Sequence, residues 1–242
     1  KSSFLKFKQF INLKTILWNI YRIITHRQLK ALRPVNLENK LNNVPSIYCK
    51  TIKKGKYSQY FHSENIQEIM NHQLDFILRF GFNIIRGEVL EVARYGVWSF
   101  HHDDEQKYRG VPSGFWEIYH GDPVTGSLLQ RINDRLDGGV ILRKGFFRTK
   151  SYSYGKNLNL ILSESAHWPY QVCLDIKNGH TNYIDDSPST TNAPIFRSPN
   201  NKQLLKYFCK LSWNILNKII RRIFIDYIYN IGIIEKPIHY FL

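Results

Sequence analysis

The chain has little of several features that would assign it to a familiar class of protein. Only three of its 242 residues are cysteine, and their odd number and wide spacing (Cys49, Cys173, Cys209) exclude a disulfide framework and a cysteine-based zinc site. No run reaches the roughly 20 uninterrupted apolar residues of a membrane-spanning helix. No Gly-x-Ser-x-Gly nucleophile elbow is present. We therefore expect a cytoplasmic protein that is neither disulfide-rich nor an α/β-hydrolase.

Acidic residues are also scarce. Lysine and arginine number 34 against 19 aspartate and glutamate residues, which gives a formal net charge of +15. Such a surface attracts anions such as phosphates, nucleotide sugars, polyglutamates or acidic lipid. Nucleic acid is not the expected partner, because no DNA- or RNA-binding module is recognisable. Hydrophobic residues make up 43% of the chain, which is enough for a packed core.

The hydrophobic pattern predicts an α/β protein with a mostly parallel, Rossmann-like sheet and flanking helices. Residues 64–101 alternate helix, strand, helix and strand, which is typical of a parallel sheet. The polar residue Ser63 opens the first of these helices, which is expected to run to about residue 71. The strands fall at 74–78 and 96–101, with a turn and helix over 83–95 between them. Further strands are expected at 46–52, 127–132 and 140–149, helices at 4–31, 114–120, 158–176 and 201–229, and a loop at 177–200.

Three regions follow from this pattern. Residues 1–66 hold a basic helix and a partial α/β half, 67–199 the catalytic core, and 200–242 a basic helical extension that leads to a further domain. The extension has two interpretations. It can lie on an anionic membrane surface, peripheral to the inner face, with Trp213, Phe224 and Tyr227 inserted into the membrane. The simpler alternative is that it packs on the core or on another domain.

Two polar segments are candidate sites of chemistry. Residues 99–105 (SFHHDDE) follow a predicted strand, at the end where open α/β sheets bind ligands. Ser99 and His101 are two residues apart, so in a strand their side chains point to the same side. Residues 134–139 (DRLDGG) form a polar loop whose glycines allow close approach of a ligand to the backbone. A histidine and a carboxylate from these segments can meet over one pocket, where the carboxylate would favour the charged imidazolium.

Residues 70–150 carry a series of short motifs in a fixed order: His101, Arg109-Gly110, Pro112, Gly121-Asp122, Thr125-Gly126 and Leu136-Asp137-x-Gly139. In this order they resemble the core of the folate-dependent formyltransferases, the family of the methionyl-tRNA and glycinamide ribonucleotide formyltransferases. Several landmarks in register are more specific than any single motif. The sequence departs from the family where Ser99 replaces an asparagine and where residues 103–106 (DDEQ) replace Ser-Leu-Leu-Pro.

The resemblance implies an enzyme that transfers a formyl group from 10-formyltetrahydrofolate, its co-substrate, to an amine. His101 would stabilise the tetrahedral oxyanion. Asp137 would keep His101 charged and help remove the proton of the attacking amine. Ser99 would add a further hydrogen-bond donor with a shorter side chain. The remaining implied contacts are Arg79, Phe80, Gly81, Phe82, Asn133 and Leu136 for the folate, and His102, Arg109 and Gly110 for the acceptor.

A second resemblance concerns the end of the chain. Residues 230–242 (NIGIIEKPIHYFL) resemble the first strand of a domain related to glucosamine inositolphosphorylceramide transferase, which follows such a formyltransferase-like domain in a divergent branch. This implies a glycosyltransferase-like domain as covalent neighbour. It also suggests an anionic small molecule, an amino sugar or nucleotide sugar, as the acceptor.

Other interpretations stay open at this point. The domain can be a catalytically decayed scaffold that binds a nucleotide sugar or a membrane surface for an attached glycosyltransferase, or a formyltetrahydrofolate hydrolase that uses water in place of the amine. Residues 103–105 can be a solvated loop. Together with His101 and His102 they can also suggest a metal site, although adjacent strand residues point opposite ways, so we predict none.

Overall fold

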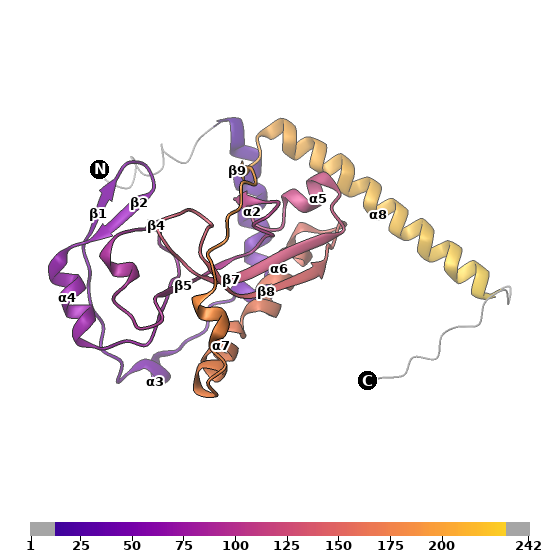
Figure 1. Cartoon of the computed structure of the whole chain (residues 1–242). Coiled ribbons are helices and arrows are strands. Elements are labelled where there is room, and N and C mark those ends of the chain that lie inside the picture. Colours follow the sequence, from indigo (N-terminus) through magenta and orange to yellow (C-terminus); the bar gives the residue numbers. More distant parts are fainter. Residues whose placement is uncertain (1–12, 231–242) are drawn as a thin grey trace.

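The computed structural model describes residues 13–230 of the chain. A four-stranded sheet lies at its centre, in the order β3 (Ile77–Leu78), β5 (Val97–His101), β7 (Val124–Arg131) and β8 (Val140–Arg148). Strands β3 and β5 are parallel, whereas β5 with β7 and β7 with β8 are antiparallel. The α/β class is confirmed, but the sheet is mixed rather than mostly parallel, because β7 and β8 form a long hairpin (Figure 1).

Two small sheets flank the central one. The first contains β1 (Thr51–Lys54), β2 (Ser58–Phe61) and β4 (Ile84–Ile85), in which β2 is antiparallel to β1 and parallel to β4. The second pairs β6 (Arg109–Gly110) with β9 (Ile195–Phe196) in parallel. Gly110 has a φ of +94°, and a Cβ there would lie 2.2 Å from the carbonyl oxygen of Phe196. Only glycine therefore allows this pairing, which fixes the chain next to the candidate site.

Helices cover the sheet and extend beyond it. They are α2 (Ile16–Gln28), α3 (Glu38–Leu41), α4 (Ser63–Asn71), α5 (Trp116–His120), α6 (Tyr154–Ser165), α7 (Trp168–Lys177) and α8 (Asn201–Asn230). Short 3-10 turns lie at Leu13–Thr15, Lys30–Leu32, Glu88–Leu90 and Asn182–Asp185. Ser153 begins α6 by accepting a hydrogen bond from the Lys156 amide, which satisfies a free helix N–H. No helix among residues 13–230 combines the length and apolar character needed to cross a membrane.

Several predicted elements are confirmed, and others are corrected. The strands at 96–101, 127–132 and 140–149 and the helices at 63–71, 114–120 and 201–229 are present within a few residues. The expected helix over 83–95 is wrong, because Ile84 and Ile85 pair with β2 and only a 3-10 turn follows. The expected strand at 46–52 begins only at Thr51. The helix predicted over 158–176 is two helices, and the second has Pro169 in its first turn.

The predictions for the two ends are only partly open to comparison. The basic N-terminal helix is present as α2, and its residues 4–12 lie outside the described residues. The expected strand in 230–242 also lies outside them. The long loop expected at 177–200 contains a 3-10 turn and β9. This segment returns to the candidate site rather than serving only as a linker.

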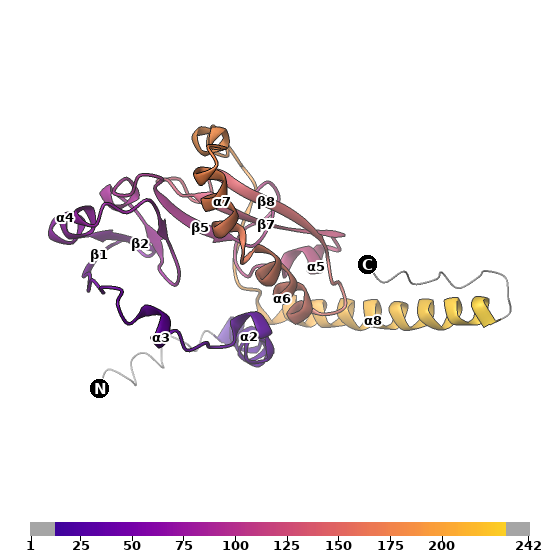
Figure 2. The same cartoon turned by 90° about the horizontal axis from the view of Figure 1, so that it is seen from below.

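Three hydrophobic clusters among the described residues hold the fold together, and two of them join its layers. One joins the sheet to α7 through Trp98, Leu129, Leu142, Trp168 and Val172, all less than a tenth exposed. The other is an aromatic core where α2, α5, α6 and the first turns of α8 meet (Figure 2), and it includes Trp18, Phe115, Tyr154 and Tyr207. Strand side chains alternate between faces, so Trp98 enters the core below the sheet while Ser99 points to the other side.

Candidate active site

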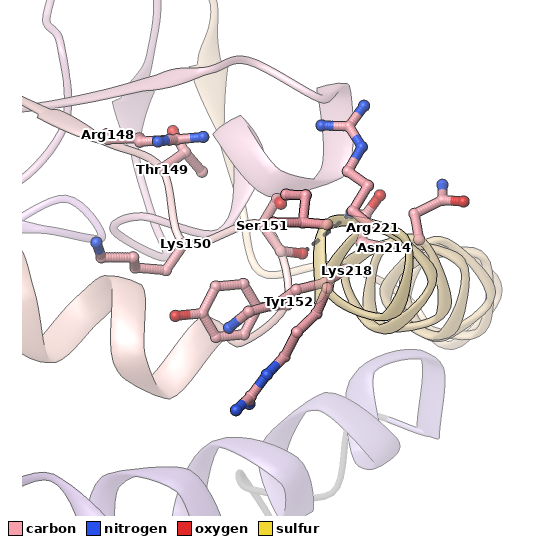
Figure 3. Close-up of a pocket in the computed structure, with 11 residues that line it drawn as sticks. Arg148, Thr149, Lys150, Ser151, Tyr152, Asn214, Lys218 and Arg221 are labelled. Carbon is pink, nitrogen blue, oxygen red and sulfur yellow. Dashed lines mark hydrogen bonds between the residues drawn. The ribbon is translucent and has the colours of Figure 1, made fainter. Parts of the chain in front are cut away.

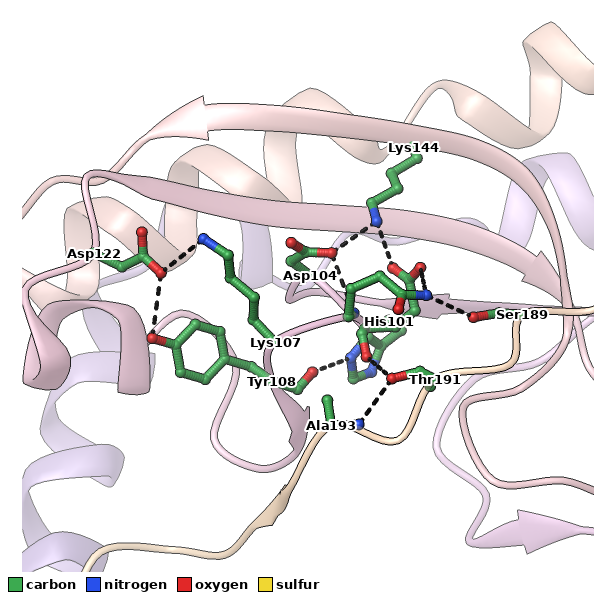
Figure 4. Close-up of polar contacts among 11 residues, drawn as sticks. His101, Asp104, Lys107, Tyr108, Asp122, Lys144, Ser189, Thr191 and Ala193 are labelled. Carbon is green, nitrogen blue, oxygen red and sulfur yellow. Dashed lines mark hydrogen bonds and ion pairs between the residues drawn. The ribbon is translucent and has the colours of Figure 1, made fainter.

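His101 is the last residue of β5 and is only 8% exposed. Its Nε2 lies 3.1 Å from the main-chain carbonyl oxygen of Tyr108 (Figure 4). A carbonyl can only accept a hydrogen bond, so Nε2 carries a proton. The other ring nitrogen, Nδ1, faces the Asp137 carboxylate, with 3.7 Å between Nδ1 and Oδ1. The residues from the two predicted polar segments are thus next to each other.

Asp137 lies in the loop between β7 and β8 with a left-handed backbone, φ +54°. This conformation is uncommon outside glycine, although aspartate and asparagine tolerate it best. Asn133 stabilises the loop by donating from Nδ2 to the Gly138 carbonyl at 2.8 Å and accepting from the Arg135 amide at 2.9 Å. The predicted folate residue Asn133 therefore shapes the loop that carries Asp137.

The outer side of Asp137 faces Arg109. The Arg109 Nε and the Asp137 Oδ2 are 3.7 Å apart, and both atoms are buried without a hydrogen-bond partner among the described residues. Arg109 is anchored by hydrogen bonds from its terminal nitrogens to the carbonyls of Leu136, at 2.8 Å, and Ala193. A buried donor or acceptor without a hydrogen-bond partner lowers the free energy of unfolding, and a bound ligand that forms the missing hydrogen bond removes this penalty.

Arg79 occupies the space that the short Ser99 side chain leaves. Its Nη1 donates to the Ser99 Oγ at 2.8 Å, and its Nη2 donates to the carbonyls of Phe82 and Asn83. Burial lowers the pKa of the Arg79 guanidinium, and the nearby charge of Asp137 opposes that shift. The group stays charged at any physiological pH. Its Nε is buried without a hydrogen-bond partner among the described residues.

A cavity of about 270 Å³ joins these groups. Six of the predicted contacts line it together with the His101–Asp137 pair: Arg79, Ser99, His102, Gly110, Asn133 and Leu136. Phe80, Gly81 and Phe82 are not among the lining residues. Phe80 and Phe82 are largely exposed, so the structure brings their loop only to the edge of the cavity. Arg109 reaches the site through its contact with Asp137.

The side chain of His102 contacts two uncharged side chains, Ser127 and Phe100. Its Nδ1 lies 3.0 Å from the Ser127 Oγ, and its ring stacks on Phe100. Burial, with a smaller contribution from the neighbouring charge of His101, lowers the pKa of His102 to about 4. His102 is therefore neutral near neutral pH and offers the cavity an uncharged polar surface. Among the described residues, no group of histidine, cysteine and carboxylate side chains is arranged to hold a metal ion.

Residues 103–105, for which a solvated loop was one interpretation, are largely buried. Asp103 is 3% exposed and Glu105 is 2% exposed. Lys144 of β8 lies 2.7 Å from the Asp104 Oδ1 and 2.8 Å from the Glu105 Oε2 (Figure 4). Burial opposes the charge on Lys144, but hydrogen bonds and charges of both carboxylates outweigh it and raise the pKa of Lys144. This triad ties the loop after His101 to the sheet.

A second buried acidic group lies behind the loop. Asp103 accepts a hydrogen bond from the Gly114 amide at 2.7 Å and lies close to Glu117 of α5, which is fully buried. Burial and the charge of Glu117 raise the pKa of Asp103, and burial raises the pKa of Glu117 to about 7. Sequence spacing gave no signal for this pair, because the two residues lie on different elements.

The Asp103–Glu117 pair makes the stability of the protein depend on pH. Carboxyl groups with raised pKa values hold protons that the unfolded chain has released, so the free energy of unfolding falls as pH rises from about 4.5 through about 7. We expect Glu117→Gln to be more stable than wild type by about 2–3 kcal/mol near pH 8, with little difference near pH 4. Urea unfolding at both pH values measures this difference. The exposed control Glu91→Gln should show no such gain, and an equal gain in it would contradict the assignment.

The geometry supports acid–base chemistry at a carbonyl. The His101 imidazole, the Arg79 guanidinium and the Asp137 carboxylate line a small cavity, and Arg109 contacts that carboxylate. Cationic groups in such a place stabilise a developing oxyanion, and the carboxylate can accept a proton from a nucleophile.

The chain was compared with protein families, curated proteins and solved structures. No family model matches the chain. It is 27% identical over 161 residues to a methionyl-tRNA formyltransferase of Clostridium perfringens (strain SM101 / Type A), which covers 65% of the chain and 51% of the relative. A methionyl-tRNA formyltransferase of Borrelia turicatae (strain 91E135) is 26% identical over 160 residues, with the same coverage.

One solved structure among those similar to the chain is glycinamide ribonucleotide transformylase 1 from Symbiobacterium toebii. It is 15% identical, covers 48% of this chain and 56% of its own, and superposes with a TM-score of 0.43. The chain spans about half the length of the curated relatives it matches. Over about two thirds of its length, the chain is a divergent sequence relative of the methionyl-tRNA formyltransferases.

Proposed function

We propose that the chain transfers a formyl group from 10-formyltetrahydrofolate to the amine of a small anionic acceptor. The observation that supports this most is the buried His101–Asp137 pair, both members of which line a cavity that is also lined by the cationic side chains of Arg79 and Arg135. The sequence relationship to formyltransferases over the same region supports the reaction class. Within the three regions proposed from the sequence, residues 67–199 carry this activity.

The residues divide the work as follows. The amine attacks the formyl carbon, a C–N bond forms, and the carbonyl electrons move to the oxygen. The charges of His101 and Arg79 stabilise that oxyanion. The Asp137 carboxylate, whose Oδ2 has no hydrogen-bond partner among the described residues, accepts the amine proton. The bond to the folate nitrogen then breaks as that nitrogen takes up a proton, which the His101–Asp137 pair supplies. A formamide and tetrahydrofolate are the products.

The site fits the reacting end of a folate. The cavity of about 270 Å³ lies just below the roughly 300–1,000 Å³ of pockets that enclose a whole drug-sized ligand. It therefore suits the folate's ring system and formyl group, with the glutamate tail outside. Arg79 lines the cavity, and its Nε, a buried donor without a hydrogen-bond partner among the described residues, suits the carbonyl oxygen that becomes the oxyanion. The net charge of +15 suits an anionic tail and an anionic acceptor.

Arg79 takes the role that Ser99 is too short to fill. The Ser99 hydroxyl accepts the Arg79 Nη1 proton and donates its own proton to the Phe100 carbonyl, with 3.3 Å between the oxygens. It therefore has no proton left for a substrate. The guanidinium beside it has an unused donor at Nε. The loss of a family asparagine at this position is thus compatible with activity.

Calorimetric titration of 5-formyltetrahydrofolate into the purified chain tests the proposal. We expect saturable binding that weakens in Asp137→Asn and not in Asp134→Asn, which changes an exposed residue of the same loop. Absence of binding at millimolar ligand, with a cooperative unfolding transition showing that the protein is folded, would contradict it. A decayed scaffold would then be the better interpretation.

Turnover assays separate the remaining alternatives. Release of tetrahydrofolate that requires an amino sugar or nucleotide sugar supports transfer to that acceptor class. Release without any amine supports the hydrolase. A covalent glycosyltransferase-like neighbour and a membrane partner are further proposals. Mass measurement and membrane fractionation of the native protein test them.

A further inference from the structure

A second pocket lies far from the His101 cavity. It is formed between the segment that joins β8 to α6, residues 148–152, and the outer half of α8, and its volume is about 660 Å³ (Figure 3). It shares no lining residue with the cavity of the candidate active site. Strand β8 begins beside the Asp137 loop and ends at Arg148, so its nine residues separate the two sites by roughly 25 Å.

The charge of this basic pocket is of one sign. Five of its eleven described lining residues are cationic, and none is acidic: Arg148, Lys150, Lys218, Arg221 and Arg222 are joined there by Thr149, Ser151, Tyr152, Asn214, Asn217 and Ile225. Five like charges around one hollow repel each other, and this repulsion destabilises the folded state. A bound polyanion would turn that repulsion into attraction.

The pocket is held in shape by contacts across its two walls. Asn214 of α8 donates from Nδ2 to the Ser151 carbonyl at 3.0 Å, which joins the helix to the β8–α6 segment. Lys218 lies with its Nζ 3.5 Å from the centre of the Tyr152 ring, a cation–π contact that orients the ammonium. Figure 3 shows Lys218 of α8 and Tyr152 of the β8–α6 segment next to each other.

The side chains suit phosphate in particular. Arginine presents a planar fork that matches two phosphate oxygens, and lysine adds a compact point charge. The hydroxyls and amides of Thr149, Ser151 and Asn217 can donate to further oxygens. Five cations exceed what one phosphate group can neutralise, and the volume leaves room for more than one.

We propose that this basic pocket binds a ligand with two or more linked phosphate groups. The proposal stands on the pocket alone and does not rest on the formyltransferase activity. A soluble diphosphate and the phosphorylated headgroup of a lipid share this chemistry. The concave shape between a loop and a helix favours a compact ligand over the extended backbone of a nucleic acid.

The test is calorimetric titration of inorganic pyrophosphate into the whole chain, with sulfate at equal ionic strength as the comparison. We expect pyrophosphate to bind and sulfate to bind far more weakly. The double variant Lys218→Ala/Arg221→Ala should weaken pyrophosphate binding at least about tenfold, since each charged hydrogen bond contributes at least this factor. The matched control Lys40→Ala/Lys53→Ala removes two exposed charges elsewhere and should leave the dissociation constant unchanged.

Further measurements distinguish a soluble ligand from a lipid headgroup and define the results that would contradict the proposal. Binding of free pyrophosphate supports a soluble ligand, whereas sedimentation only with vesicles that contain a phosphoinositide, and not with phosphatidylcholine alone, supports a lipid headgroup. Equal binding by both double variants, or binding of pyrophosphate and sulfate with equal affinity, overturns the proposal. Binding of an RNA duplex with neither of the other ligands overturns it as well. Thermal unfolding without ligand shows whether the Lys218→Ala/Arg221→Ala protein is folded.

Discussion

Replacing Asp137 by asparagine is expected to lower kcat/KM for formyl transfer by about a thousandfold, within the range of about 10²–10⁴ typical of a lost general base. Asparagine keeps the size of the side chain and tolerates the left-handed backbone at φ +54°, so the loop should keep its shape. What it removes is the negative charge beside His101 Nδ1 and Arg109 Nε, and the proton acceptor at Oδ2. Tetrahydrofolate release with the best acceptor in the amino-sugar screen measures the loss.

The matched control for this variant is Asp134→Asn, three residues earlier in the same loop. The Asp134 side chain is 71% exposed, and its Oδ1 lies 3.7 Å from Arg86 and accepts a hydrogen bond of 3.5 Å from the Gly87 amide. An exposed pair of this kind contributes at most about 1 kcal/mol, so activity should stay within a few-fold of wild type. If Asp137→Asn kept a similar activity, its carboxylate would have no part in proton transfer, and the proposed division of roles would fail.

Replacing Lys144 by methionine is expected to destabilise the protein by about 3–5 kcal/mol, the usual cost of removing one partner from a buried ion pair. Methionine fills a similar volume, but it leaves Glu105, only 2% exposed, and Asp104 without their shared cation. The loop after His101 then loses its main tie to β8. Chemical denaturation near neutral pH measures the loss.

Lys107→Met is the control for the Lys144 variant. Lys107 also pairs with a carboxylate, with 3.2 Å between its Nζ and the Asp122 Oδ2, but its side chain is 55% exposed. Water screens such a pair, and its removal should cost no more than about 1 kcal/mol. Equal losses in the two variants would mean that Lys144 contributes only as a surface charge.

The sequence predicted the parts of the fold whose signals are local. The alternation at residues 96–101 and 140–149 and the polar residue that opens the helix at Ser63 are visible in short windows, and these elements are present. The segment 83–95 shows the opposite case. Ile84 and Ile85 become a strand only because Ser58 and Gln59 lie beside them in β2, 26 residues away in the chain. No local pattern carries that information, so a turn and helix were the wrong prediction.

The candidate site shows the same division. Resemblance and spacing placed His101 and Asp137 in one pocket, and the structure puts them 3.7 Å apart. The contact between Arg79 and Ser99 went unpredicted, although the parallel register of β3 and β5, Leu78 beside Trp98, places the two next to each other. Finding it from sequence needed the register, which depends on the whole sheet. The burial of Asp104 and Glu105 could likewise not be predicted from sequence, because their partner Lys144 lies in β8, about 40 residues later in the chain.

The hydrogen bond from His101 Nε2 to the Tyr108 carbonyl has a consequence for any mutational study of the site. The acceptor belongs to the main chain, so every amino acid placed at position 108 would still present it. The main chain, and not the side chain at position 108, therefore determines that Nε2 carries the proton of the neutral imidazole. Every variant at position 108 keeps this acceptor. Differences in rate among variants at position 108 then report on the contacts of the replaced side chain and not on a switch of the His101 tautomer.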